Sequence, residues 1–235
     1  MASDQLISIV IVTRNAEHFL QRCLDSIFSQ EYPSIEIIIM DGASTDATLS
    51  IIEKNSDRIA FWKSEKDDGI YDAMNKALDV VQGKWIYFLG ADDMLTSDFS
   101  LFAKNLKDPN FIYYGSVQKA GVKYLGKLAP YHQAKTGINH QAIIYPVEIF
   151  SIYRYDTTYL ISADHVFNMR FNKHEKFRFK FVDFDIAIFN DTGISSVQKD
   201  PVFEQRKGRL ILKYFGMKIF LRFQFKVLKA KLLSA

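Results

Sequence analysis

The sequence has little that would place it outside the ordinary globular proteins. Its one cysteine, Cys23, cannot form an intramolecular disulfide, so we expect a reducing compartment. The longest stretch without Asp, Glu, Lys or Arg covers residues 136–147, which are 12 residues that include His140. Because a spanning helix needs about 20 apolar residues, we expect none. Residues 1–5 contain no Lys or Arg, so we also predict no signal peptide.

Several motifs of nucleotide binding and catalysis are absent as well. The sequence contains no G-x-x-x-x-G-K-[ST] and no G-x-G-x-x-G, which excludes the P-loop and dinucleotide-binding classes. No Cys/His set has zinc spacing, and no G-x-S-x-G elbow occurs. What remains is a chain of 235 residues, 48% hydrophobic and 24% charged, which is long enough to bury a sizeable core.

Acidic residues are absent after Glu204. The C-terminal tail, residues 205–235, holds nine Lys and Arg, so residues 1–204 hold the other 21 basic residues and all 27 acidic ones, a net charge of −6. An acidic body with a basic tail predicts an anionic partner for the tail alone. We expect no nucleic-acid partner, because only the tail is basic.

Short β-branched runs alternate with helical patterns in the first 95 residues. We expect strands at residues 6–12, 35–40, 59–63 and 84–89, and helices at residues 16–30, 44–55 and 71–81. We expect Asn15 to cap the first helix and Ser44 or Thr45 to cap the second. This alternation predicts an α/β fold with a mostly parallel central sheet flanked by helices.

The pattern is less regular after about residue 110. We expect strands at residues 111–118, 122–128 and 177–190, and a helix at residues 162–171. No linker rich in Pro, Gly or Ser divides the body. We therefore take residues 1–204 as one domain, followed by the tail.

Polar clusters follow three of the predicted strands: Thr13-Arg14-Asn15, Asp41-Gly42 and Asp92-Asp93. Right-handed crossovers place the carboxyl ends of parallel strands on one edge of the sheet, and open α/β sheets bind ligands there. An edge rich in carboxylates and amides predicts a site for a metal and a polar ligand.

Of these clusters, Asp92-Asp93 gives the most specific indication of a function. Adjacent carboxylates repel each other, which costs stability unless a cation or hydrogen-bond donors offset it. Mg²⁺ prefers one or two carboxylates together with waters and substrate phosphates. The alternative is a loop that only precedes the next helix. Together with the other clusters, the pair favours an ion that neutralises a bound diphosphate.

Two further segments have both a structural and a functional interpretation. Residues 41–46 fit a turn with a helix cap, or a nucleotide contact in which Asp41 accepts hydrogen bonds from a base or sugar. Residues 67–76 contain the turn signal Asp68-Gly69. Lys76 lies on the helix that follows, where it is either solvated or balances a phosphate.

Asp164 is the candidate general base. It would remove a proton if it reached the same pocket, which its spacing alone does not show. Next to it is His165, and His140 precedes Gln141. Either histidine is most simply a core or surface residue.

Four motifs in order resemble family 2 glycosyltransferases of the GT-A fold, especially the bacterial branch that builds capsule, O-antigen and other exopolysaccharides. They cover residues 8–15, 41–46, 68–76 and 83–93. The likeness is strong over residues 6–95. It continues more weakly through His140-Gln141, Ala163-Asp164 and residues 188–196.

The resemblance implies transfer of a sugar from a nucleotide-diphosphate donor, most often a UDP-sugar, with inversion at the anomeric carbon. It implies Mn²⁺ or Mg²⁺ at the departing diphosphate, with Asp93 as the main ligand and Asp92 near the ribose and the metal. Asp164 matches the aspartate that takes the proton of the acceptor hydroxyl. The residues that would bind the nucleotide sugar are Thr13, Arg14, Asn15, Asp41, Ser44, Asp68, Gly69, Tyr71, Asn75, Lys76, Asp92 and His140. Residues 1–95 would form a nucleotide-binding half, and residues 96–204 an acceptor and catalytic half.

Two positions depart from the family's pattern. The acidic motif is Ala91-Asp92-Asp93 rather than a spaced D-x-D, a form that is common in this branch of the family. His165 stands where an aromatic residue is expected, which makes the match of Asp164 weaker than that of Asp93.

The C-terminal tail alternates basic and apolar residues. On one helix Lys218, Arg222, Lys226 and Lys229 fall on one side, which fits contact of residues 206–233 with an anionic membrane surface. Packing on the body and an oligomer contact are the alternatives. Because acceptors in this family are often lipid-linked, we expect a protein of the bacterial cytoplasm, peripheral at the inner face of the membrane.

Two other functions compete with an inverting, metal-dependent glycosyltransferase. A sugar-phosphate nucleotidyltransferase also handles nucleotide sugars on an α/β sheet, but its Gly-rich entry loop with a following Arg is missing. A catalytically inactive, membrane-bound subunit that binds nucleotide sugars would not need the intact Asp92-Asp93 pair and Asp164.

Overall fold

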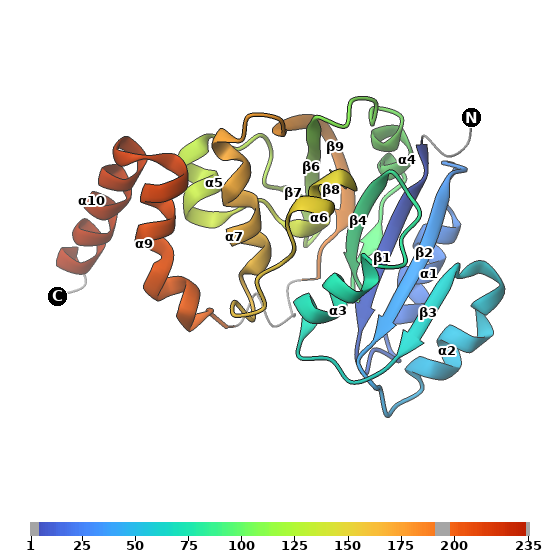
Figure 1. Cartoon of the computed structure of the whole chain (residues 1–235). Helices are drawn as coiled ribbons and strands as arrows, with labels where there is room; N and C mark the ends of the chain where they lie inside the picture. The colour runs from blue at the N-terminus through green and yellow to red at the C-terminus, as the bar shows by residue number, and fades with distance from the viewer. Residues whose placement is uncertain (1–4, 191–197, 234–235) are drawn as a thin grey trace.

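A single mixed sheet runs through the computed structural model, which describes residues 5–190 and 198–233 (Figure 1). The strands follow the order β3-β2-β1-β4-β8-β6-β9-β5, and β7 pairs with β6. Their bounds are β1 (Ile7–Thr13), β2 (Ile35–Asp41), β3 (Phe61–Ser64), β4 (Trp85–Gly90), β5 (Met94–Leu95), β6 (Phe111–Lys119), β7 (Val122–Tyr124), β8 (Ile143–Pro146) and β9 (Arg178–Ile188). The pairings among β3, β2, β1 and β4 are all parallel, which confirms the predicted α/β fold.

Helices cover both faces of this sheet. Their bounds are α1 (Leu20–Phe28), α2 (Thr48–Lys54), α3 (Ile70–Ala77), α4 (Asp98–Ala103), α5 (Pro130–Thr136), α6 (Glu148–Ile152), α7 (Ala163–Met169), α9 (Pro201–Phe215) and α10 (Met217–Leu233). Alternate strand residues enter two separate cores, because successive side chains point to opposite faces. Val10 and Phe88 pack with α3, α6 and α7, whereas Ile9 and Ile11 pack with α1, α2 and α4. Burial on both faces explains why the strands are nearly continuous apolar runs.

The second half of the chain joins the sheet in a mixed arrangement. Strand β8 is antiparallel to both of its neighbours, β4 and β6, and it was not predicted. The predicted strand at residues 177–190 is β9, and it pairs with β6 in parallel, with register shifts between Tyr114 and Val117. Gly115 lies at this irregularity, where an added Cβ would come within 2.6 Å of the Phe184 carbonyl oxygen. A side chain at position 115 would therefore force the two strands apart.

Two predicted helix caps are wrong. Helix α1 begins at Leu20 rather than residue 16, and α2 begins at Thr48 rather than residue 44, both without a side-chain cap. Asn15 has a positive φ of 52°, and its Oδ1 accepts a hydrogen bond from Thr45 N at 2.9 Å. Ser44 Oγ accepts one from Asn15 N at 2.8 Å. These side chains hold the loops after β1 and β2 together instead of starting helices.

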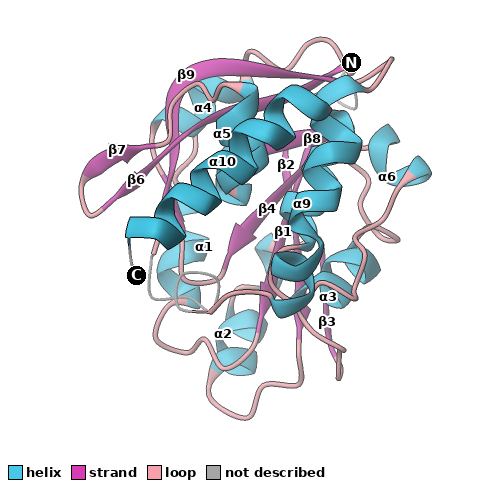
Figure 2. Ribbon diagram, turned by 90° about the vertical axis from the view of Figure 1, so that its left-hand side faces the viewer, coloured by secondary structure: helices cyan, strands magenta, loops and turns pink. Residues whose placement is uncertain are grey.

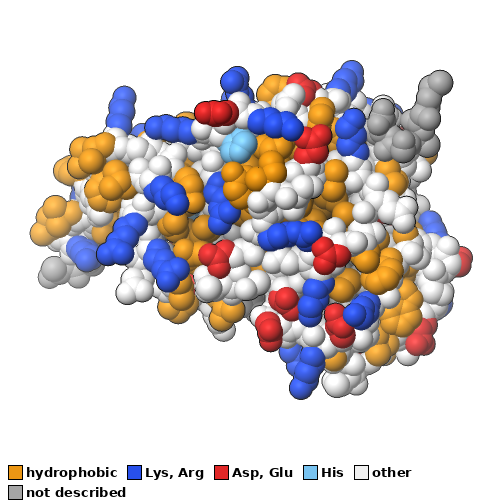
Figure 3. Space-filling model, viewed as in Figure 1, with side chains coloured by type: hydrophobic (Ala, Val, Ile, Leu, Met, Phe, Trp, Pro, Cys, Tyr) orange, Lys and Arg blue, Asp and Glu red, His pale blue; other side chains and the backbone are white. Residues whose placement is uncertain are grey.

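The C-terminal tail forms part of two helices rather than one. Gly216, with a positive φ of 82°, separates α9 from α10. Helix α9 crosses residue 204 and buries Phe203, Ile211 and Phe215 against the body. Helix α10 packs along α9 and α5 but buries no side chain completely (Figure 2). Basic and hydrophobic side chains alternate over this end of the molecule (Figure 3).

None of the helices within residues 5–190 and 198–233 combines the length and apolar character needed to cross a membrane. Cys23 is fully buried on α1, and its Sγ lies 3.5 Å from the Gly90 carbonyl oxygen. Burial raises the pKa of this thiol.

Candidate active site

The carboxyl ends of β1, β2 and β4 meet at one edge of the sheet. Thr13 pairs with Asp41, and Val12 pairs with Gly90. The polar clusters that follow these strands therefore converge, as the sequence predicted.

Asp41 organises the loop after β2. It is 2% exposed, and its carboxylate accepts hydrogen bonds from Ser44 N at 2.9 Å, from Ser44 Oγ and from Ser64 Oγ at 2.5 Å. In the loop after β1, Arg14 and Asn15 are exposed to solvent. Thr13 Oγ1 is buried beside them with no hydrogen-bond partner among the described residues.

The backbone comes close to other groups at Gly42. An added Cβ there would lie 2.7 Å from Asp67 Oδ2 and 3.5 Å from the Arg14 side chain. A side chain at position 42 would require the Asp67 carboxylate to move, so glycine allows the loops after β2 and β3 to approach this closely.

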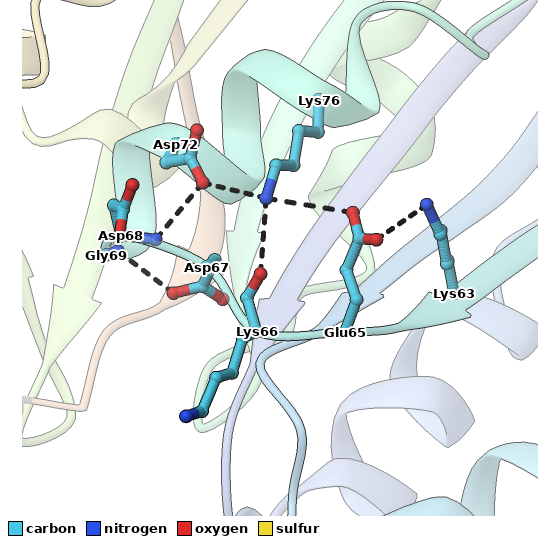
Figure 4. Close-up of polar contacts among 8 residues, drawn as sticks. All are labelled: Lys63, Glu65, Lys66, Asp67, Asp68, Gly69, Asp72 and Lys76. Carbon is cyan, nitrogen blue, oxygen red and sulfur yellow. Dashed lines mark hydrogen bonds and ion pairs between the residues drawn. The ribbon is translucent and has the colours of Figure 1, made fainter.

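The loop between β3 and α3 is held by Lys76 (Figure 4). Lys76 Nζ lies 2.9 Å from Asp72 Oδ2, 3.7 Å from Glu65 Oε1 and 3.3 Å from the Lys66 carbonyl oxygen. The hydrogen bond to Asp72 raises the pKa of Lys76, which keeps its ammonium group charged. In this structure the predicted phosphate-binding lysine supports its own loop.

The turn at Asp68-Gly69 lies within the same loop. Asp68 N donates to Asp72 Oδ2 at 3.1 Å, and Gly69 N donates to Asp67 Oδ1 at 2.9 Å. Gly69 has a φ of 112°, which favours glycine over any other residue. Asp68 and Gly69 are both exposed, so they border the edge without being enclosed by it.

Helix α3 joins the two halves of the chain. The Asn75 side chain bonds both backbone groups of Tyr155, Nδ2 to the carbonyl oxygen and Oδ1 to the N–H, each at 3.0 Å. Its amide is therefore occupied in anchoring the loop before α7. One turn earlier, the Tyr71 hydroxyl lies 2.8 Å from Asp164 Oδ1 and 2.8 Å from the Ile161 carbonyl oxygen.

Asp164 stands in the first turn of α7 with two partners. Tyr71 contacts Oδ1, and His140 Nδ1 lies 3.6 Å from Oδ2, with 16% of the Asp164 side chain exposed. Burial alone would raise the pKa of Asp164, but its contacts with His140 and Tyr71 outweigh burial and hold the pKa below its ordinary value. The same contact raises the pKa of His140 against the opposing effect of burial. The site thus keeps Asp164 as a carboxylate.

His165 does not join the site. Its Nε2 lies 2.9 Å from the Gln133 carbonyl oxygen, and its ring packs on Phe203 at 4.9 Å between centroids. Burial lowers its pKa, which favours the neutral ring. The simple interpretation of this histidine as a core residue is confirmed.

Asp92 and Asp93 differ sharply in exposure. Asp93 is 1% exposed and accepts hydrogen bonds from Asn190 N at 2.7 Å and from the Gln141 side-chain amide. Asp92 is half-buried, and its Oδ2 accepts one from Asn190 Nδ2 at 3.2 Å. Burial raises the pKa of Asp93 to about 6, and the negative charge of Asp92 adds to the rise.

The acidic pair fits a divalent cation. Both carboxylates converge above Gly90, where an added Cβ would lie 3.0 Å from Asp92 Oδ1 and closer still to Asp93 Oδ2. Within the described part of the chain no group of three or more His, Cys, Asp or Glu gathers at one point. Two carboxylates match the small protein contribution that Mg²⁺ takes when substrate phosphates and waters complete its shell.

A short turn at His140–Ala142 links the two acidic centres. His140 faces Asp164, and the next side chain, Gln141, faces Asp93. The turn is fixed by Asn139 Oδ1, which accepts from Gln141 N at 2.9 Å, and by the Tyr87 hydroxyl, which donates to the Gln141 carbonyl oxygen at 2.7 Å.

Gln141 and Asn190 were not among the predicted site residues. The signal for both was the weaker part of the resemblance, which includes Gln141 beside His140 and Asn190 within residues 188–196. Residues 191–196 of the predicted similarity at 188–196 lie outside the described residues.

Residues 8–178 match Glycosyl transferase family 2. The chain belongs to this family. Among its relatives, a PGL/p-HBAD biosynthesis glycosyltransferase of Mycobacterium tuberculosis is 32% identical over 217 residues, covering 86% of this chain and 83% of the relative. The Escherichia coli UDP-Glc:alpha-D-GlcNAc-diphosphoundecaprenol beta-1,3-glucosyltransferase WfaP is 41% identical over 90 residues, 38% of this chain and 36% of that protein.

The fold has solved neighbours. Staphylococcus aureus TarS 1-349 in complex with UDP-GlcNAc superposes with a TM-score of 0.69 at 15% identity, covering 89% of this chain and 67% of that one. A Pyrobaculum calidifontis mannosyltransferase in complex with GDP-Man and Mn²⁺ superposes with a TM-score of 0.63 at 18% identity, covering 89% and 62%. These likenesses confirm the GT-A type of fold.

Proposed function

We propose that this family 2 glycosyltransferase moves a sugar from a UDP-sugar to a hydroxyl of a lipid-linked saccharide, with inversion, in bacterial cell-surface glycan synthesis. One observation carries the proposal: the edge of the sheet joins an ionised Asp164 to the Asp92–Asp93 pair through the turn at His140–Ala142. A relative whose name includes a UDP-Glc donor and a diphosphoundecaprenol acceptor supports it. So does the solved neighbour in complex with UDP-GlcNAc.

Asp164 serves as the base in this reaction. The acceptor oxygen forms a bond to the anomeric carbon, its proton passes to Asp164, and the bond from that carbon to the diphosphate oxygen breaks with its electron pair leaving on UDP. A single displacement from the opposite face gives inversion. Tyr71 and His140 hold the Asp164 carboxylate in place and favour its ionised form before the proton moves.

The acidic pair supplies the cation site of the proposal. Asp92 and Asp93 would hold Mn²⁺ or Mg²⁺, which supplies positive charge where the diphosphate departs. Gln141 and Asn190 fix the orientation of Asp93 before any ligand binds. Asp92, which is more exposed, offers its Oδ1 to the same space.

The proposed nucleotide wall lies in residues 1–95, at the ends of β1, β2 and β3, and the acceptor side lies in residues 96–204. The wall comprises Thr13, Arg14, Asn15, Asp41, Ser44, Asp68 and Gly69. Asn75 and Lys76 support it by fixing the loops on either side of α3.

A thermal-shift screen of nucleoside diphosphates with and without Mn²⁺ tests the donor. Ligand at 100 times its Kd stabilises a protein by about 2.7 kcal/mol. In a domain of this size that is about 5–11 °C in Tm. We expect UDP to give this shift with Mn²⁺ and a smaller one without it, with GDP and ADP as matched controls.

The screen and assays of product release can also contradict the proposal. No shift with any diphosphate, with or without metal, would oppose a nucleotide-sugar site. Release of pyrophosphate from a nucleoside triphosphate and a sugar phosphate would favour the nucleotidyltransferase instead. Donor binding without UDP release in the presence of any saccharide acceptor would favour the inactive binding subunit.

We also propose that the C-terminal tail contacts an anionic membrane surface and keeps the enzyme at the inner face of the cytoplasmic membrane. Helix α10 exposes an apolar stripe with spacings of four, four, three and four, each side chain 57–71% exposed: Met217, Leu221, Phe225, Leu228 and Leu232. Basic side chains border it at Lys218, Arg222, Lys226 and Lys229. Phe220 and Phe223, on the other side of the helix, pack on the body. The stripe and its basic border suit acyl chains beneath anionic headgroups.

Replacing Leu221, Phe225 and Leu228 by Ser tests this membrane contact. A buried Leu or Phe side chain contributes about 1.5–3 kcal/mol, so we expect binding to liposomes containing phosphatidylglycerol to weaken about 10-fold or more. The matched control replaces three exposed apolar residues elsewhere, Leu101, Val122 and Ile152. Equal co-sedimentation of both triple variants with the liposomes would rule the contact out. Substitution is preferable to truncation at Glu204, because α9 contributes to the core.

A further inference from the structure

Asp200 connects the C-terminal helices to the turn that precedes α7. It is 2% exposed, although it stands at the start of a surface helix. Its Oδ1 accepts a hydrogen bond from Phe203 N at 3.0 Å, which caps α9. Its Oδ2 accepts from Ile161 N at 2.9 Å and from Ser162 N at 3.2 Å. One carboxylate thus binds two segments that lie about 40 positions apart in the sequence.

The turn at Ile161 and Ser162 is next to the proposed base. The Ile161 carbonyl oxygen contacts the Tyr71 hydroxyl, which in turn contacts Asp164. Ser162 immediately precedes α7, and Asp164 lies in the first turn of that helix. A shift of this turn would therefore move both Asp164 and the hydroxyl that holds it.

Capping alone does not account for this arrangement. Helices α1 to α7 all begin without a side-chain cap, and the fold tolerates this. A cap also needs only one acceptor oxygen, directed at one or two N–H groups of its own helix. Burying a carboxylate is costly unless hydrogen-bond donors compensate it. Two of the three donors here belong to the turn at Ile161 and Ser162 rather than to α9.

We propose that Asp200 is a positioning residue for Asp164. Its carboxylate holds the backbone at Ile161 and Ser162, so that Asp164 and Tyr71 keep the geometry needed for proton removal from the acceptor. The inference rests on the proposed glycosyl transfer. It also gives the start of α9 a role in the reaction, because one carboxylate bonds both that helix and the turn that precedes Asp164.

The variant Asp200→Asn separates the two roles. Its Oδ1 can still cap α9, because Asn is as good a cap as Asp, while its NH₂ group opposes the N–H groups of Ile161 and Ser162. The second variant, Asp200→Ser, keeps a capping hydroxyl and lacks the second oxygen. The matched control is Asp156→Asn, in the loop that precedes α7. Asp156 Oδ1 accepts a hydrogen bond from Thr158 N at 3.1 Å, and this contact does not involve Asp164.

We expect kcat to fall about 10- to 100-fold in both Asp200 variants, because small misplacements of a reacting group have effects of this size. The KM for the donor should stay within about twofold, since the nucleotide wall is untouched. Hydrogen exchange should become faster at the amides of residues 161 and 162, and the acidic limb of the kcat profile should move to higher pH. A merely stabilising cap would lower the active fraction without moving that limb.

Each outcome decides the inference. Unchanged kcat and an unchanged pH profile in an active Asp200→Asn enzyme would overturn it and leave the proposed function standing. Equal losses in Asp156→Asn would also overturn it. Absence of transfer by the wild-type chain with every donor would overturn the proposed function, and this inference with it.

Discussion

An Asp164→Asn enzyme is expected to turn over about 10²–10⁴ times more slowly than wild type, because that is the usual contribution of a positioned base. Asn cannot accept the acceptor proton, yet it keeps the size of the side chain and its contact with Tyr71. Donor binding should change little, since the side-chain partners of Asp164, Tyr71 and His140, are not among the residues of the nucleotide wall. Single-turnover transfer rates, with UDP affinity measured separately, check both parts.

The pH profile gives a second test of the same residue. Because His140 and Tyr71 hold the pKa of Asp164 below its ordinary value of 3.8, the limb of kcat that Asp164 contributes should lie below that pH when saturating Mn²⁺ keeps Asp93 ionised. His140→Gln removes the largest of the lowering contacts and should move the limb upward. A variant Asp164→Asn with wild-type kcat would contradict the assignment of the base, whatever the profile shows.

An Asp92→Asn enzyme should lose the part of the UDP-induced Tm shift that depends on Mn²⁺, while its Tm without ligand stays that of wild type. The reason is the exposure of Asp92, which contributes an oxygen to the space above Gly90 and only one hydrogen bond to the fold. Transfer should fall by about 10² or more, because the charge on the departing diphosphate is then poorly balanced. Mn²⁺ titrations followed by thermal shift measure the binding part without any activity assay.

Asp93 requires a different design. Replacing it by Ala would leave two buried donors, Asn190 N and the Gln141 amide, without a partner, at a cost of about 1–3 kcal/mol each. Asp93→Asn keeps an acceptor for Asn190, so a loss of metal response in that variant reports on the cation site rather than on folding. Asp98→Asn, in the first turn of α4, is the matched control. A full Mn²⁺ response in both Asp92→Asn and Asp93→Asn would rule out this cation site.

The sequence predicted the part of the fold in which local pattern and global structure agree. Strands β1, β2 and β4 were placed within one residue at each end, because strands buried on both faces are continuous apolar runs. The parallel arrangement of these strands then predicted that Thr13, Asp41 and the acidic pair lie at one edge of the sheet, although no contact between them was known.

The missed features depend on contacts between distant segments. Ser44 suits a helix cap, but its side chain bonds Asp41 and the Asn15 N–H in the loop instead, and α2 starts later. Strand β8 is only four residues long, and it is buried by neighbours from other parts of the chain. Gly216 was available as a break signal within the tail, where the basic and apolar alternation on either side favours one continuous helix.

The same limit applies to the site. The motif positions were predicted by their sequence, but the partners of those positions were not. Asn75 bonds the Tyr155 backbone, and Gln141 and Asn190 bond Asp93, across separations of 48 to 97 residues. Such partners follow from packing, which no local pattern encodes.

The burial of Cys23 makes the protein a convenient host for a chemical probe. Its thiol is enclosed by α1 and the sheet, and its raised pKa keeps it protonated, so maleimide reagents should leave the folded wild-type chain unmodified. A cysteine introduced at the exposed Ala230 of α10 would then take the label alone. A fluorophore at that position could follow the helix from water into lipid in real time.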